Sequence, residues 1–113
     1  MGTIYSQHLG SHKLTTVTSV VLYTVPSSGG PCIVKGHMMQ VGASCAGGIY
    51  LTQSGVTCYL DYVTAPAGGG IIGRALVDWQ VLSPGDTVTL EADTISGGLW
   101  VIGSISGQQF SQP

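Results

Sequence analysis

The apolar residues of this chain follow the spacing of β-strands rather than that of helices. Nowhere does a pattern of apolar residues at i, i+3, i+4 and i+7 continue for three turns, so the sequence predicts almost no helix. Short runs rich in β-branched and aromatic residues are separated by Gly, Pro, Ser and Asp, a spacing typical of sandwiches and barrels. We therefore predict an all-β chain with under about a tenth of its residues in helices.

Turn-forming residues divide the chain into the predicted strands. The segment from Pro26 to Pro31 ends the first β-rich run. Ser54-Gly55 predicts a hairpin. Gly36 lies inside one predicted strand, where a β-bulge would bend it. The predicted strands cover residues 14–25 (one or two strands), 32–41, 49–53, 56–63, 71–81, 87–92 and 99–105.

These strands predict the architecture of the whole chain. A length of 113 residues suits one domain with a single core. About seven to nine antiparallel strands in that length predict a two-layer, jelly-roll-like β-sandwich. We expect the sandwich to cover residues 14–107. The polar residues 1–13 then form an N-terminal arm and residues 108–113 a C-terminal tail.

Alternation along the last two strands predicts which side chains face the core. In Thr87 to Ala92 the apolar side chains occupy every second position, so they share one face of the strand. Two apolar residues of the closing strand are also two positions apart. The predicted core residues of these strands are Val88, Leu90, Ala92, Trp100 and Ile102.

Charge is scarce, which excludes some partners. Charged residues make up 7% of the chain, against a usual share of about 25%. Three Lys and Arg residues against five Asp and Glu leave no basic stripe for nucleic acid. No long apolar run spans a membrane, and the N-terminus lacks the features of a signal peptide. We therefore expect a soluble, unprocessed chain that binds neither nucleic acid nor a membrane.

The scarcity of charge also requires an explanation of solubility, because small proteins normally stay dispersed through net charge and charged surface residues. One interpretation is a monomer whose surface is coated with Ser, Thr and Gln. The other is a subunit whose faces are largely buried against neighbouring subunits. We favour the subunit.

The three cysteines do not indicate a disulfide framework or a metal site. Cys32, Cys45 and Cys58 are odd in number and form no C-x-x-C pair. Together with His37 they match the ligand types of a Cys₃His zinc site, but structural zinc sites usually have closely spaced ligand pairs. We expect small buried apolar side chains. One disulfide between two of the three remains an alternative.

No catalytic or cofactor motif has the structural context that it needs. Gly68 to Gly73 fits the dinucleotide pattern G-x-G-x-x-G, but a strand-like run follows where a helix must begin. His8, His12 and His37 have no acidic residue close in sequence, and none is paired with a nucleophile. The chain is therefore predicted not to be an enzyme, with no catalytic residues, no cofactor and no metal.

Several polar and aromatic residues have competing interpretations. Asp86 is expected to accept hydrogen bonds in its turn, and Asp61 is expected to point outward. Arg74 and Asp78 share one face of a predicted strand, where they form either a surface ion pair or an interface contact. The two Trp and five Tyr residues suit burial in a core or interface, with a sugar-binding platform as the alternative.

Three segments resemble a widespread group of small virion proteins of tailed bacteriophages. They are Leu22 to Gly29, Val81 to Leu90 with its Pro-Gly-Asp turn, and Gly97 to Gly107 as a closing strand before a short tail. The resemblance covers about Leu22 to Gly107. It implies a β-sandwich accessory protein of the phage particle and brings no catalytic residues with it.

The resemblance and the residue patterns lead to one first hypothesis. We expect a decoration or cement subunit on the capsid, or a neck or tail subunit, located in the virion. Its partners would be copies of itself, as a homotrimer or other small ring, and major capsid or neck and tail proteins. The alternative is a small lectin-like module that binds carbohydrate or a host surface. Candidate interface residues are Ile4, Tyr5, Leu9, Arg74 and Asp78.

Overall fold

The protein is an all-β sandwich, seen in a computed structural model that describes residues 7–68 and 70–111. Eight strands and no helix occur in these residues. The described residues therefore contain no helix that is long and apolar enough to cross a membrane. The strands are β1 (Gln7–Leu14), β2 (Thr18–Thr24), β3 (Cys32–Val41), β4 (Ala46–Gln53), β5 (Val56–Thr64), β6 (Ile72–Leu82), β7 (Thr87–Thr94) and β8 (Val101–Gln109).

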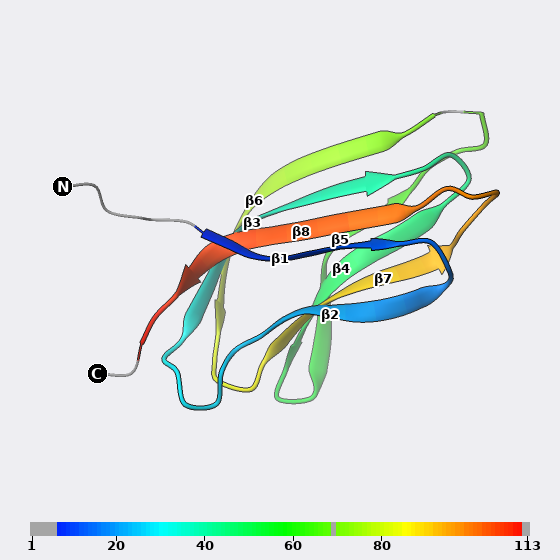
Figure 1. Cartoon of the computed structure of the whole chain (residues 1–113). Helices are drawn as coiled ribbons and strands as arrows, with labels where there is room; N and C mark the ends of the chain where they lie inside the picture. The colour runs from blue at the N-terminus through cyan, green and yellow to red at the C-terminus, as the bar shows by residue number, and fades with distance from the viewer. Residues whose placement is uncertain (1–6, 69, 112–113) are drawn as a thin grey trace.

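Two antiparallel four-stranded sheets form the layers (Figure 1). Sheet A has the strand order β1-β8-β3-β6, and sheet B has the order β2-β7-β4-β5. Only β4 and β5 are neighbours both in sequence and in a sheet; every other connection crosses from one sheet to the other. This order is that of a jelly roll, so the predicted fold class is confirmed.

The strands at the two ends of the chain extend beyond the predicted sandwich. Gln7 to Lys13 belong to the segment predicted as an arm, yet they form most of β1. This strand is an edge of sheet A and pairs with β8. In turn β8 continues to Gln109, inside the predicted tail. Polar composition alone therefore did not separate an edge strand from an arm.

The core lies between the sheets and is mainly aliphatic. Val88, Leu90 and Ala92 are almost completely buried, as their alternation predicted. In β8 the prediction chose the wrong face. Val101 and Ile105 face the core, whereas Trp100 and Ile102 are only partly buried.

The sheets approach each other too closely for a side chain at one position of β8. A Cβ atom at Gly103 would lie 2.7 Å from Leu90 Cδ1 and 3.2 Å from Ile49 Cδ1. Large apolar residues occur on both faces of β8, so their alternation does not identify the core face. The inner face combines Val101 and Ile105 with glycine where sheet B presses against it.

Two predicted turns are confirmed in detail. Ser54 and Gly55 connect β4 and β5 with positive φ angles of 51° and 81°, as a two-residue hairpin of type I′ requires. In the turn before β7, Asp86 Oδ2 accepts a hydrogen bond from Ser83 N at 2.8 Å. Asp86 N donates to Ser83 O at 3.0 Å.

The face of β8 can be tested with two equal truncations. Ile105→Ala should lower the free energy of unfolding by about 2–5 kcal/mol, because it leaves a cavity in the core. Ile102→Ala removes the same atoms from the outer face and should cost about 1 kcal/mol or less. Denaturant unfolding of both variants measures the difference. Equal costs would contradict the assignment of the faces.

Candidate functional site

A bulge in β3 turns His37 into the interior. The pairing of β3 shifts between Val34 and Gly36 against both of its neighbours, β6 and β8. Before the shift the buried positions are Cys32 and Val34, and after it they are His37, Met39 and Val41. The bulge predicted at Gly36 is therefore confirmed, and it decides which side chains of β3 face inward.

A second bulge turns Asp61 inward, which corrects the prediction that it points outward. In the β4–β5 pair, Ile49 lies opposite Asp61 and Tyr50 lies opposite Tyr59, so Leu60 has no partner. This extra residue changes the alternation of β5. Asp61 then shares the face of the fully buried Ile49, and its side chain is 8% exposed.

His37, Asp61, Arg74 and Asp78 meet between the sheets, and we call them the histidine cluster. The His37 ring is completely buried, with Nε2 2.9 Å from Asp61 Oδ2 and Nδ1 2.7 Å from Asp78 Oδ2. Arg74 Nε lies 3.1 Å from the same Asp61 oxygen. Asp61 comes from sheet B and the other three residues from sheet A. The cluster therefore joins the sheets on their β5/β6 side.

The hydrogen bonds define the role of each group. Each ring nitrogen of His37 faces one carboxylate oxygen, Nε2 that of Asp61 and Nδ1 that of Asp78. Arg74 Nε contacts the same oxygen of Asp61. With both ring nitrogens occupied and no exposed surface, His37 has no free nitrogen to act as a base on a substrate. The geometry is that of a structural clamp.

The five predicted interface residues lie in different parts of the chain, and two of them are outside the described residues. Arg74 and Asp78 both lie in β6 and both join the histidine cluster; each contacts a different residue rather than the other. Leu9 lies in β1 and packs partly against the core. Ile4 and Tyr5 are outside the described residues.

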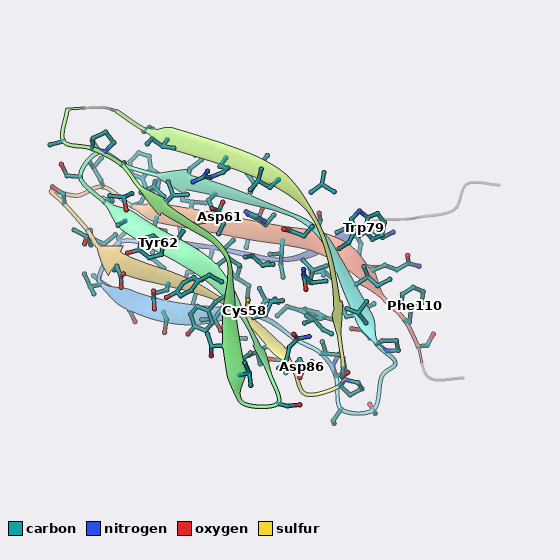
Figure 2. All side chains as sticks on the ribbon, turned by 180° about the vertical axis from the view of Figure 1, so that it is seen from behind. Cys58, Asp61, Tyr62, Trp79, Asp86 and Phe110 are labelled. Carbon is teal, nitrogen blue, oxygen red and sulfur yellow. The ribbon has the colours of Figure 1, made fainter. Side chains whose placement is uncertain are left out.

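Strand β6 sends two charged side chains to the histidine cluster and exposes several large apolar ones. Asp78 is 10% exposed and Arg74 is 42% exposed, whereas Val77, Trp79 and Val81 are 79%, 66% and 61% exposed. Figure 2 shows Trp79 where β6 bends. With Met38 of β3, 45% exposed, these three side chains form an apolar area that we call the β6 patch.

A shallow hollow lies beside the β6 patch on the outer face of sheet A. Its volume is about 280 Å³. Small residues of three adjacent strands make the space: Gly36, Ala75, Ser104 and Ser106. Next to it, Lys35 Nζ lies 5.6 Å from the centre of the Trp79 ring and donates a hydrogen bond to Gln108 Oε1 at 3.3 Å. The ammonium and the ring make a cation–π contact.

The outer face of sheet B carries a group of aromatic and acidic side chains. Tyr50, Tyr59 and Tyr62 contact edge to face, with ring centres 5.5 and 5.8 Å apart. Tyr59 Oη donates to Glu91 Oε1 at 2.7 Å, and Tyr62 Oη donates to Asp93 Oδ2. We call these five residues the tyrosine cluster. Figure 2 labels Tyr62 on β5.

The carboxylates of the tyrosine cluster change the acidity of two phenols. A hydrogen bond to Glu91 raises the pKa of Tyr59 from 10.0 to about 12. A hydrogen bond to Asp93 raises the pKa of Tyr62 to the same value. Both phenols donate while neutral, and deprotonation would place two negative charges side by side.

The three cysteines are free, and the prediction that they are buried is correct for two of them and wrong for the third. Cys32 and Cys45 are buried, and Cys58 of β5 is exposed. Burial raises the pKa of the Cys32 thiol. The described residues contain no group of three or more His, Cys, Asp or Glu residues that fits a metal ion.

Comparison with known proteins does not assign the chain to a family. No protein-family model matches it, and no curated protein has a significant match.

The histidine cluster gives a prediction for stability. His37→Ala leaves two buried carboxylates without their shared partner, which should lower the free energy of unfolding by about 3–5 kcal/mol. The exposed His12 is the matched control, and His12→Ala should change stability by less than about 0.5 kcal/mol. Thermal and denaturant unfolding would measure both variants. A small effect of His37→Ala would mean that the clamp is dispensable.

The tyrosine cluster gives a prediction for titration. Two tyrosines should ionise near pH 12 in an ultraviolet titration, and Glu91→Gln should return one of them toward 10.0. The folded pKa values lie above the ordinary value, so the hydrogen bonds stabilise the fold below pH 10. That contribution is lost as the pH rises from about 10 to about 12. Five tyrosines ionising together near 10 would contradict the assignment.

Proposed function

We propose that this chain is a structural, non-catalytic accessory subunit of a bacteriophage virion. In this proposal it is attached to the capsid as a decoration or cement subunit, or to the neck or tail. It works as a repeated subunit, a homotrimer or another small ring. The phage virion is proposed because the segment from Leu22 to Gly107 resembles small phage virion proteins. Assembly into oligomers is proposed from the surface of the molecule.

The distribution of exposed apolar side chains is the observation that carries the assembly part. Twelve large apolar residues are exposed among residues 7–68 and 70–111, and three of them lie away from strands β3, β5 and β6: Val17, Val21 and Phe110. The other nine belong to β3, β5 and β6 or lie next to them: Met38, Val56, Tyr59, Tyr62, Ile71, Leu76, Val77, Trp79 and Val81. They are divided between the outer faces of the two sheets, and exposed apolar area of this kind is typical of surfaces that bind another protein.

The histidine cluster supports a non-catalytic role. It gathers the only fully buried imidazole of the described residues together with two carboxylates. The ring nitrogens already bond to the two carboxylates, and in the described part of the chain no hydroxyl or thiol shares a hydrogen bond with the ring. Such a set binds strands together and offers a substrate neither a nucleophile nor a free base.

A second candidate function, a lectin-like module, is favoured by the tyrosine cluster. Phenol rings and carboxylates on one exposed face are groups that bind sugars, through stacking and through hydrogen bonds to hydroxyls. In this chain each carboxylate already accepts a phenolic hydrogen bond. A sugar would compete with those hydrogen bonds, so we place this function second.

Two measurements test the proposed function. Sedimentation velocity from low micromolar to millimolar concentration should show a small oligomer that forms with increasing concentration. Phage particles that lack the chain should bind it at regular positions, which electron microscopy would locate on head, neck or tail. A strictly monomeric chain that ignores such particles but is retained on a glycan surface would favour the lectin-like module instead.

A further inference from the structure

We propose that copies of this chain associate head to tail, with the outer face of sheet A on the outer face of sheet B of the next copy. This inference rests on the self-association in the proposed function and names its two surfaces. The occupant of each face is therefore a second copy of the chain. The separation of charge between the two sheets is the observation that leads to it.

Cations lie in one sheet and most of the anions in the other, with Asp78 of β6 as the acidic residue in the strands of sheet A. All three cationic residues of the chain, Lys13, Lys35 and Arg74, lie in strands of sheet A. The strands of sheet B contain no Lys or Arg, and they carry Asp61, Glu91 and Asp93.

The groups that reach the outer faces keep the same division. Asp61, Arg74 and Asp78 are used inside, in the histidine cluster. Lys35 remains on the outer face of sheet A beside Trp79. Glu91 and Asp93 remain on the outer face of sheet B beside the tyrosines. One outer face is therefore cationic and the opposite one anionic.

Both faces also present apolar surface close to these charges. Sheet A offers the β6 patch and the adjacent hollow of about 280 Å³. Sheet B offers Tyr59 and Tyr62, which are 48% and 41% exposed. Burial of such side chains provides affinity, while complementary charge determines which faces meet.

Each outer face is large enough for a stable protein–protein interface. A typical stable interface buries about 800 Å² on each partner, and the solvent-accessible surface of this chain is 5954 Å². The molecule measures 51 × 35 × 18 Å along its principal axes, so a broad face exceeds the area required. A second copy can therefore be held without any further segment.

The same charges disfavour symmetric contacts between like faces. Two A faces would bring Lys35 toward its equivalent, and two B faces would gather four carboxylates. Contact of an A face with a B face pairs opposite charges instead. Such a contact is heterologous, and it closes into a ring when the rotation between successive copies allows it.

The test uses charge reversal on each face. Lys35→Glu replaces the cation beside Trp79 with an anion and should weaken self-association at least about tenfold, because this anion then meets the carboxylates of face B. Glu91→Lys on face B should have the same effect by the opposite change. Ser28→Glu adds a negative charge in the exposed turn between β2 and β3, outside both faces, and should leave association unchanged.

A mixture of the two reversed variants distinguishes this arrangement from a general effect of charge. The anionic face A of Lys35→Glu pairs with the cationic face B of Glu91→Lys, and the two remaining faces are unaltered and complementary. An equimolar mixture should therefore form alternating oligomers of the original size in sedimentation velocity, although each variant alone is mainly monomeric. Circular dichroism and melting curves show whether each variant keeps the fold.

The outcomes separate this inference from the proposed function. If the unaltered chain is monomeric at every concentration, self-association fails and both are overturned. If the chain oligomerises but both reversed variants associate like the unaltered chain, only the assignment of the faces is overturned. It is also overturned if the mixture stays monomeric, or if the variants lose binding to particles while self-association is unchanged.

Discussion

The sandwich depends on an ionic contact between its sheets on the β5/β6 side. In the histidine cluster, Asp61 of sheet B contacts the buried His37 ring and the partly exposed Arg74 of sheet A, and His37 in turn contacts Asp78. On the opposite side, β1 and β2 approach by their backbones, since a Cβ atom at Gly10 would collide with Leu22 O. The two sides are closed by different means, and only the ionic side places polar residues of an edge strand inside. That arrangement leaves the apolar residues of β6 to face solvent.

The sequence predicted the local features of the fold better than the pairings between distant segments. The alternation of Val88, Leu90 and Ala92, the Ser54-Gly55 hairpin and the bulge at Gly36 each depend on a few adjacent residues, and all three are present. The prediction of the core-facing side of β8 was wrong because apolar residues occupy both faces of the strand, and glycine occurs on the inner face. The polar edge strand β1 carries too little alternation to be distinguished from an arm.

The histidine cluster could not be predicted from the sequence, for a physical reason. Asp61 and Asp78 are 24 and 41 residues from His37 along the chain, so no local motif connects them. Two independent bulges must also occur before His37 and Asp61 face each other. The sequence contained only a weak indication of the cluster. Arg74 and Asp78 lie on one face of a mainly apolar strand, which indicated polar partners on that side. The tyrosine cluster likewise needs β5 to lie beside β4 and β4 beside β7.

The position of β8 has a consequence for the synthesis of the protein. This strand lies between β1 and β3 in sheet A, although β1 leaves the ribosome first and β8 last. Until β8 emerges, β1 has no hydrogen-bonding neighbour in sheet A and β3 has only one. The nascent chain can complete sheet B beforehand, since β7 precedes β8, but the core stays open to solvent on one side. Sheet A therefore closes only after β8 has been synthesised, and a pause in translation before β8 would prolong exposure of the unpaired strand edges.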